Sequence, residues 1–321
     1  MSRKKIVLTA YWPQSVVAAM EENYTVIAPK EGEKLAGDDL IHALKDADAI
    51  APLFYDKLDK DFIDALPQGF SLIAGFGIGT DHIDINAANK RGIAVSNTPD
   101  VVTIDTADLA IGLMIAASRR FYEREKAIRD GTWGELALMA GLGGRITGKT
   151  LGIVGMGRIG QAVAKRAQAF DMKVIYTSRT RKPELEESLG LHYIADLNQL
   201  LSEADIISLH AALTPDTHHM IDKDSFAAMK PTAVLINTGR GGLVDEKAMV
   251  TALKEMQIMA AGIDVYEYEP KLAAGLAELD NATLLPHIGT ATYETREAMG
   301  MRVKENIDHF FKTGVALDPV K

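Results

Sequence analysis

The stretch that decides the fold runs from Leu151 to Thr180 and reads LGIVGMGRIGQAVAKRAQAFDMKVIYTSRT. A short apolar run leads into a glycine-rich turn. A helical pattern follows, and a second apolar run spans Lys173 to Tyr176. A glycine pattern of this type indicates a ligand only when a strand precedes it and a helix follows it, as here. The segment therefore predicts a βαβ dinucleotide-binding unit.

Each glycine of the motif has a physical task. Gly155 permits the tight turn after the strand, Gly157 lets the backbone approach a pyrophosphate, and Gly160 allows close packing of helix on sheet. The unpaired N–H groups and the positive dipole end of the helix then face the phosphates. The motif thus predicts where the cofactor phosphates bind.

The residues after the second strand bear on the choice of cofactor. An NAD-binding unit usually has an acidic residue there, which holds the ribose 2′-hydroxyl. This chain has Ser178, Arg179 and Thr180, followed by Arg181 and Lys182. A guanidinium binds a 2′-phosphate through charge-assisted hydrogen bonds, whereas a carboxylate repels it. We therefore expect NADP(H) to be preferred, with NAD(H) as the alternative.

The composition is that of a two-domain enzyme. The chain has 321 residues, a formal net charge of -9 and no cysteine. The length suits two cores, and the negative charge argues against nucleic acid or an anionic membrane as partner. The lack of cysteine excludes disulfides and thiolate sites, and we expect no metal ion. With no signal peptide or membrane-length apolar run, the expected location is cytoplasmic.

Short apolar runs alternate with helical patterns over most of the chain, which predicts parallel sheets covered by helices on both faces. The expected fold is α/β, with a Rossmann dinucleotide-binding domain inserted into a flavodoxin-like substrate domain. We place the substrate domain at residues 1–98 and 289–321 and the Rossmann domain at residues 99–288. The expected strands before the glycine motif are Ile6 to Leu8, Thr25 to Ala28, Ala49 to Leu53, Leu72 to Ala74 and Ile93 to Val95; those after its second strand are Ile206 to Leu209, Ala233 to Ile236, Met259 to Ile263 and Thr283 to Leu285.

Residues 121–149 form a polar, glycine-rich segment without a clear period. Trp133, Leu136, Leu138 and Met139 would be exposed there on a monomer, and a patch of that kind invites association. Two-fold dimers are the commonest oligomers. We therefore expect this arm to pack on a second copy in a homodimer.

Three ionisable residues follow predicted strands of the second half. Arg240, Glu269 and His287 each come just after an apolar run, and open α/β sheets bind ligands beyond the carboxyl ends of their strands. Their side chains form a working set: a guanidinium for a carboxylate, an imidazole that transfers a proton, and an acid that orients it. We expect them to be the catalytic residues.

Five segments resemble the D-isomer-specific 2-hydroxyacid dehydrogenase family, and the resemblance covers nearly the whole chain. They are GMGRIG (155–160), SLHAALTPDT (208–217), INTGRGGLVDE (236–246), AGIDVYEYEP (261–270) and LLPHIGTAT (284–292). The resemblance implies the same catalytic set, Arg240, Glu269 and His287, with Glu269 rather than Glu267 as the acid.

The resemblance also implies which residues hold the cofactor and the substrate. Backbone N–H groups near Gly77 would bind the substrate carboxylate, with Leu53 and Ile78 also at the substrate. Asp264 would lie near the nicotinamide carboxamide, and His210 and Thr214 near the nucleotide. The full set expected at the cofactor is Thr106, Gly155, Gly157, Arg158, Ile159, Gly160, Ser178, Arg179, Thr180, His210, Thr214, Thr238, Gly239, Asp264 and Gly289.

Within the family, the basic segment after the second strand most resembles NADPH-dependent glyoxylate and hydroxypyruvate reductases. The implied reaction is hydride transfer from NADPH to a small 2-oxo acid, giving the D-2-hydroxy acid, with the lobes hinging near residues 97–99 and 289–291. Phosphoglycerate-type and D-lactate-type dehydrogenases remain alternatives, as does a nucleotide-sensing corepressor. Glu269 argues against a formate dehydrogenase, where the histidine usually pairs with glutamine, and the length argues against an adenosylhomocysteine hydrolase.

Overall fold

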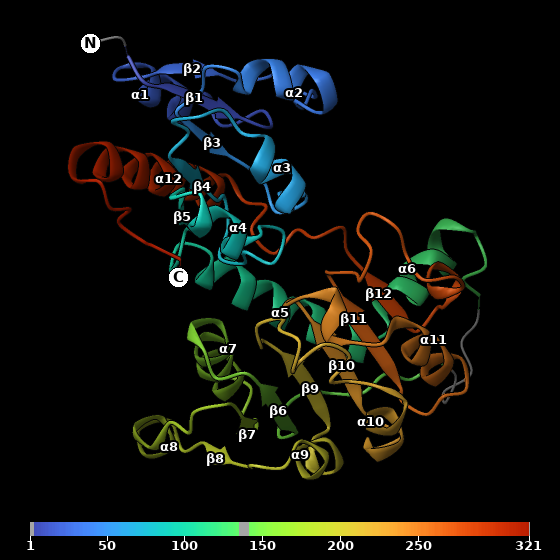
Figure 1. Ribbon diagram of the computed structural model, residues 1–321. Helices are drawn as coiled ribbons and strands as arrows, with labels where there is room; N and C mark the ends of the chain where they lie inside the picture. The colour runs from blue at the N-terminus through green and yellow to red at the C-terminus, as the bar shows by residue number, and fades with distance from the viewer. Residues whose placement is uncertain (1–2, 135–140, 321) are drawn as a thin grey trace. The chain divides into compact units, whose positions relative to one another are not determined.

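The computed structural model describes residues 3–134 and 141–320 (Figure 1). It divides into two compact units, which we treat separately. Unit 1 comprises Met1–Val102 and Thr290–Lys321, and unit 2 comprises Thr103–Gly289. The sequence had suggested boundaries after residues 98 and 288. The substrate-binding role assigned to the first of these domains stays a prediction.

Unit 1 is built on a five-stranded parallel sheet in the order β2-β1-β3-β4-β5. This is the flavodoxin-like strand order, so the prediction for this part of the chain is confirmed. Its strands are β1 (Lys5–Leu8), β2 (Thr25–Ile27), β3 (Ala49–Ala51), β4 (Leu72–Ala74) and β5 (Ala94–Ser96). Its helices are α1 (Gln14–Glu21), α2 (Gly37–Leu44), α3 (Lys60–Ala65), α4 (Ile85–Lys90) and α12 (Tyr293–Thr313).

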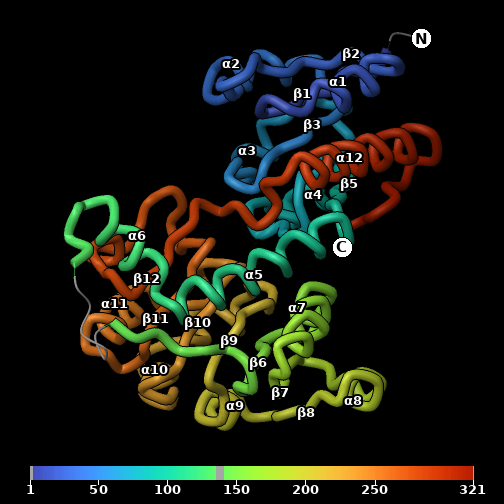
Figure 2. The backbone as a smooth tube through the Cα atoms, turned by 180° about the vertical axis from the view of Figure 1, so that it is seen from behind, coloured from blue at the N-terminus to red at the C-terminus, as the bar shows by residue number. Residues whose placement is uncertain are grey.

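Helix starts in unit 1 are set by side chains that accept hydrogen bonds from the backbone. The carboxylates of Asp59 and Asp84 accept N–H groups of the first turns of α3 and α4, and the hydroxyl of Thr292 does the same for α12. The long helix α12, red in Figure 2, lies beside the sheet of this unit. A Cβ on Gly300 would lie 2.9 Å from the Val16 side chain, so glycine is needed where α12 meets α1.

Unit 2 is built on a seven-stranded sheet in the order β12-β11-β10-β9-β6-β7-β8, with all pairs parallel. The run β8-β7-β6-β9-β10-β11 has the Rossmann order, and β12 extends it by one strand. The strands are β6 (Thr150–Val154), β7 (Lys173–Thr177), β8 (His192–Tyr193), β9 (Ile206–Leu209), β10 (Val234–Asn237), β11 (Ala260–Ile263) and β12 (Ala282–Leu284). The helices are α5 (Thr103–Ser118), α6 (Phe121–Arg129), α7 (Arg158–Gln168), α8 (Pro183–Leu189), α9 (Leu197–Glu203), α10 (Lys223–Ala228) and α11 (Glu246–Lys254).

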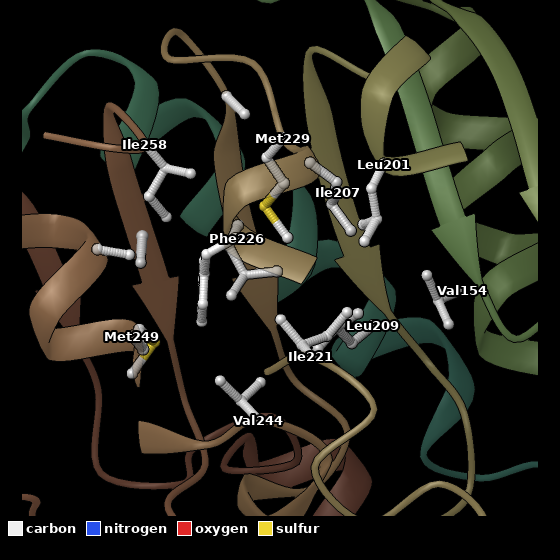
Figure 3. Close-up of a cluster of buried hydrophobic side chains, with 14 of the residues drawn as sticks. Val154, Leu201, Ile207, Leu209, Ile221, Phe226, Met229, Val244, Met249 and Ile258 are labelled. Carbon is white, nitrogen blue, oxygen red and sulfur yellow. The ribbon is translucent and has the colours of Figure 1, made fainter. Parts of the chain in front are cut away.

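Each face of this sheet carries its own hydrophobic core. On one face, Phe226 and Met229 of the α10 region pack against Ile207 and Leu209 of β9 (Figure 3). On the other face, α5 and α7 pack against β6 and β10. Burial on both faces explains why these strands read as continuous apolar runs without alternation.

Pro183 and Glu184 begin α8, because proline is well tolerated in the first turn of a helix. The segment 121–149 had no clear period, yet its first part forms α6, whose i,i+4 pairs include Arg129 with Glu125. Leu136, Leu138 and Met139 of the expected dimer arm lie outside the described residues.

None of the helices in the described part of the chain is long and apolar enough to cross a lipid bilayer.

Candidate active site

The glycine motif forms the turn between β6 and α7. Gly155 has φ of 99°, and a Cβ on it would lie 2.5 Å from the Ala211 backbone nitrogen. A Cβ on Gly160 would lie 2.2 Å from the Gly155 carbonyl oxygen. At Gly157 a Cβ would meet nothing within 4 Å. Two of the glycines are thus required by protein contacts, while the third faces open space.

The surroundings of this turn fit a dinucleotide. The N-cap residue of α7 is Gly157, which has no side chain to cap the start of the helix. The strands next to β6 in the sheet are β9 and then β10, and each is followed by a residue with a buried polar atom. These atoms are His210 Nδ1 after β9 and Thr238 Oγ1 after β10, and neither has a hydrogen-bond partner in the part of the chain that the structure describes. Buried polar atoms of this kind are normally hydrogen-bonded. Donors at a helix start beside such atoms suit a ligand that carries phosphate and hydroxyl groups.

His210 is held as a neutral ring. Its Nε2 lies 2.8 Å from Ser208 Oγ, and its backbone N–H donates to the Val154 carbonyl at 2.7 Å. Burial lowers the pKa of His210 to about 4. This ring therefore serves as a hydrogen-bonding group at neutral pH and adds no charge.

The basic loop after β7 contains two arginines in different situations. The guanidinium of Arg181 donates two hydrogen bonds to Glu186, at 2.9 and 2.7 Å, and Tyr176 donates its hydroxyl to the same carboxylate. Arg181 first, and then Tyr176, hold the pKa of Glu186 at about 2. Arg179 is exposed, and no residue within 3–134 or 141–320 accepts a hydrogen bond from it. Arg179 is thus the arginine of this loop available to a ligand.

The three expected catalytic residues come from neighbouring strands. Arg240 follows β10, Glu269 follows β11 and His287 follows β12, and these strands are adjacent in the sheet of unit 2. His287 Nδ1 lies 2.8 Å from Glu269 Oε2. A Cβ on Gly241 would lie 1.8 Å from the Tyr266 carbonyl carbon, so the Arg240 loop packs directly on the loop that leads to Glu269.

Asp264 holds the His287 loop in place. Its carboxylate accepts the backbone N–H groups of Ile288 and Gly289, at 2.7 and 2.8 Å, and its carbonyl accepts that of His287 at 2.8 Å. His287 has φ of 54°, a left-handed conformation that is costly for a residue with a Cβ. Burial raises the pKa of Asp264 to about 6, although the hydrogen bond from the Ile288 N–H lowers it. The three hydrogen bonds keep His287 in this conformation.

Glu269 is itself anchored. Its Oε1 accepts the Tyr266 N–H at 2.9 Å, which leaves Oε2 for His287. Burial alone would raise the pKa of Glu269, but the hydrogen bond and charge of His287 and the Tyr266 N–H lower it below its ordinary value. The carboxylate therefore stays charged at neutral pH and orients the imidazole.

Two further residues support this loop and were missed by sequence reasoning. Glu246, buried at the start of α11, accepts the backbone N–H groups of Glu267 at 2.8 Å and Ala273 at 3.2 Å. Burial raises the pKa of Glu246, and these two N–H groups oppose the shift. The Tyr266 hydroxyl donates to the Leu285 carbonyl at 2.9 Å, which ties the loop to the segment before His287. Nothing in the local pattern distinguishes such an acid from an ordinary first-turn glutamate.

Arg240 lies in a loop shaped by Asn237. The Asn237 side chain donates to the Arg240 carbonyl at 2.9 Å and accepts the Gly239 N–H at 3.0 Å. Arg240 Nη1 donates to the Gly239 carbonyl at 2.9 Å. Its positive charge is among the effects that lower the pKa of Glu269, so the guanidinium and the carboxylate influence one another.

The expected substrate residues of unit 1 lie together. Leu53 and Phe76 form a parallel bridge, and the Leu53 N–H donates to the Asp56 carboxylate at 2.8 Å. Gly77 has φ of 147°, and its carbonyl accepts the Thr98 N–H at 2.9 Å. Among the described residues, none accepts a hydrogen bond from the N–H groups of Gly77 or Ile78. These two donors are suited to an anion.

The remaining expected cofactor residues are distributed as follows. Thr106, buried on α5, donates its hydroxyl to the Gly289 carbonyl at 3.3 Å. The Thr214 N–H is held by Thr217 Oγ1 at 2.8 Å, and Ser178 Oγ donates to the Thr180 carbonyl at 2.7 Å. Arg158 and Ile159 form the first turn of α7. All of the expected cofactor positions therefore belong to unit 2, where they lie in the segments that follow its strands or in the helices α5 and α7.

Comparison with known proteins gives the family. A model of the D-isomer specific 2-hydroxyacid dehydrogenase NAD-binding domain matches residues 111–289. A glyoxylate reductase from Thermococcus litoralis is 45% identical over 97% of this chain and 94% of its own length.

Two solved structures are similar over nearly the whole chain. A glyoxylate reductase from Paecilomyes thermophila has a TM-score of 0.87 and 38% identity, covering 100% of this chain and 99% of its own. An NADPH-dependent glyoxylate/hydroxypyruvate reductase from Sinorhizobium meliloti, solved with NADP and malonate, has a TM-score of 0.86 and 36% identity. The match covers 99% of this chain and 97% of that one. Unit 2 is thus a nicotinamide dinucleotide-binding domain, and the chain belongs to the D-isomer specific 2-hydroxyacid dehydrogenase family of oxidoreductases.

Proposed function

We propose that this protein reduces small 2-oxo acids, glyoxylate and hydroxypyruvate foremost, to D-2-hydroxy acids. The observation that carries the proposal is the 2.8 Å contact between His287 Nδ1 and Glu269 Oε2, next to the Arg240 loop in a dinucleotide-binding unit. The names of the similar reductases supply the substrate class. A corepressor-like role has no observation in its favour.

The side chains divide the work of the reaction. The reduced nicotinamide, when bound, supplies the hydride that reaches the carbonyl carbon. His287 delivers the proton to the carbonyl oxygen from Nε2, because Nδ1 is engaged by Glu269. Arg240 binds the carboxylate and stabilises the negative charge that builds on the carbonyl oxygen. In the reverse direction, His287 accepts the proton.

Gly77 and Ile78 of unit 1 offer further donors suited to a carboxylate. Their N–H groups are donors without an acceptor in the residues that the structure describes. The Gly77 carbonyl is fixed by Thr98, and Asn97 Nδ2 donates to the Ile78 carbonyl at 2.8 Å. Preorganised donors of this kind lose little entropy when the anion binds.

The direct test is an assay of the purified protein with a panel of 2-oxo acids. Oxidation of NADPH or NADH is followed by absorbance, with glyoxylate, hydroxypyruvate, pyruvate and bulkier acids as substrates. We expect the largest kcat/KM with glyoxylate or hydroxypyruvate. Activity confined to a bulky acid, or none with any acid, would contradict the proposal.

The cofactor preference belongs to the same proposal. Arg181 is held by Glu186, whereas Arg179 is exposed and has no hydrogen-bond acceptor among residues 3–134 and 141–320. We therefore assign the 2′-phosphate of NADP(H) to Arg179, with Ser178 and Thr180 beside it. NAD(H) lacks this phosphate and gains nothing from the guanidinium.

Replacing Arg179 with aspartate should raise the KM for NADPH by at least about tenfold, because one charge-assisted contact is lost and a repulsive charge is added. The KM for NADH should change far less. Lys173 is a matched control, since it is exposed at the opposite end of β7 and Lys173→Asp changes the net charge equally. Equal effects of Arg179→Asp on both cofactors would refute the assignment.

We also propose that the protein is a homodimer held by the segment 121–149. In its described part, Phe121, Ile128, Trp133 and Leu142 have 51%, 63%, 68% and 57% of their surface exposed. An apolar set of this kind indicates an interface. The cytoplasmic location expected from the sequence stays a prediction.

Sedimentation at micromolar concentration should report a dimer, and the double substitution Ile128→Glu and Trp133→Glu should shift it toward the monomer. Burying a charge in an apolar interface is unfavourable, which is the reason for the effect. Val315→Glu, at an exposed apolar position of unit 1, should leave the dimer intact. A wild-type monomer with full activity would rule out this interface.

A further inference from the structure

Arg296 has a half-buried guanidinium. It lies at the start of α12 in unit 1, and within residues 3–134 and 141–320 no group accepts a hydrogen bond from this guanidinium or forms an ion pair with it. The guanidinium lies on an aromatic ring, with Cζ 5.8 Å from the centre of the Phe76 ring. Burial lowers the pKa of Arg296, an effect that Tyr55 opposes. A buried guanidinium is normally paired, so this one calls for a partner.

The position of Arg296 is fixed from two sides. Gly300 lies one turn later on the same face of α12 and packs against Val16, which anchors this part of the helix. The Phe76 ring is itself held by Trp12, with ring centres 4.6 Å apart, and both side chains are almost fully buried. The guanidinium therefore rests on a rigid aromatic platform. An arginine held in this way loses less entropy when it binds a ligand.

The platform is part of the loop that we assign to the substrate. Phe76 directly precedes Gly77, whose N–H is assigned to the substrate carboxylate, and Phe76 pairs with Leu53. All of these residues belong to unit 1, as Arg296 does. A molecule held at the Gly77 N–H therefore lies next to the residue whose ring carries the Arg296 guanidinium.

The charged and titratable groups that are placed near Arg296 do not pair with it. Asp56 follows Tyr55 in the chain, and its Oδ2 accepts the Leu53 N–H and the Thr9 hydroxyl. Tyr55 is half-exposed, and burial, followed by the charge of Asp56, raises its pKa, so it is neutral at physiological pH. Lys34 lies on the Tyr55 ring and adds a second positive charge. The surroundings favour an electron-rich ligand.

We propose that Arg296 is a specificity-determining residue that binds an oxygen on the third carbon of the substrate. This inference rests on the proposed function and deepens it: among 2-oxo acids of three or more carbons, the favoured substrates have a hydroxyl or carboxylate at that carbon, as in hydroxypyruvate. A guanidinium presents several donors in one plane and gains most from an oxygen acceptor. A methyl group at the same place offers it nothing and leaves the cation unpaired.

Hydroxypyruvate and pyruvate are a matched pair for the test, because they differ only in the hydroxyl on the third carbon. The ratio of their kcat/KM values, with glyoxylate as a third substrate that lacks this carbon, is measured for the wild type, Arg296→Met and Arg296→Lys. We expect Arg296→Met to lower kcat/KM for hydroxypyruvate by roughly tenfold to a hundredfold, the effect of one hydrogen bond to a charged group. The values for pyruvate and glyoxylate should change much less, and Arg296→Lys should recover part of the ratio.

Glu297→Gln, at the exposed neighbouring position of α12, should leave all three values unchanged. Circular dichroism shows whether the Arg296→Met variant folds. If it does not fold, the ratio of kcat/KM values is measured with Arg296→Lys alone. A loss of equal size on all three acids would mean that Arg296 only supports the structure, and an unchanged ratio would likewise overturn the inference. A wild type that reduces none of the acids would instead refute the proposed function itself.

Discussion

The variant His287→Ala is expected to turn over glyoxylate and hydroxypyruvate roughly a hundred- to ten-thousandfold more slowly than the wild type. This is the usual range for the loss of a general acid or base. The imidazole is the proton donor that the geometry provides, because Glu269 fixes its Nδ1 at 2.8 Å and Asp264 holds its backbone in a left-handed conformation. Steady-state rates measure the loss, and titration of NADPH fluorescence should show that cofactor binding is intact.

Two variants serve as controls for this result. His192→Ala removes an exposed imidazole at the far edge of the same sheet, on β8, and should have no effect. Glu269→Gln keeps the shape of the side chain but removes its charge, and should retain more activity than His287→Ala. Near-normal turnover of His287→Ala would show that the proton comes from another group.

The second large effect is expected at Arg240. Arg240→Met should lower kcat/KM for every 2-oxo acid by about a hundred- to a thousandfold, since it removes the donors for both the carboxylate and the developing charge on the carbonyl oxygen. Arg240→Lys keeps the charge but loses the planar pair of donors, and should recover only part of the activity. The same kinetic assay measures both variants.

The uniform loss across substrates distinguishes Arg240 from Arg296. Every 2-oxo acid has the carboxylate and carbonyl that Arg240 is assigned to bind, whereas only some have an oxygen on the third carbon. If Arg240→Met raised KM alone and left kcat unchanged, the residue would contribute to binding and not to stabilisation of the transition state.

Much of the fold was readable from the sequence because the relevant signals are local. The glycine motif and the buried strands follow from residues within one element or one turn. The strand order of both sheets agreed with expectation. The elements that were missed are those with weak local signals: the polar segment that forms α6 has no clear apolar period, and β8 has two residues, too few for a period.

The sequence could predict those residues of the candidate site that directly follow predicted strands. Arg240, Glu269 and His287 could be named because parallel strands end at the same edge of a sheet. The supporting acids could not be named, because their partners are distant backbone groups: Glu246 binds the N–H of Glu267, 21 residues later in the chain. Arg296 was missed for the same reason, since its contact with Phe76 joins a C-terminal helix to an N-terminal loop.

The measurement that tests the central claim most directly is the chirality of the product. Hydroxypyruvate is reduced with NADPH by the purified protein, and the glycerate formed is analysed by chiral chromatography. Membership of the D-isomer specific 2-hydroxyacid dehydrogenase family predicts D-glycerate, and hydride transfer predicts one NADPH consumed for each molecule formed. L-glycerate, a racemic mixture, or consumption of NADPH without glycerate would contradict the account.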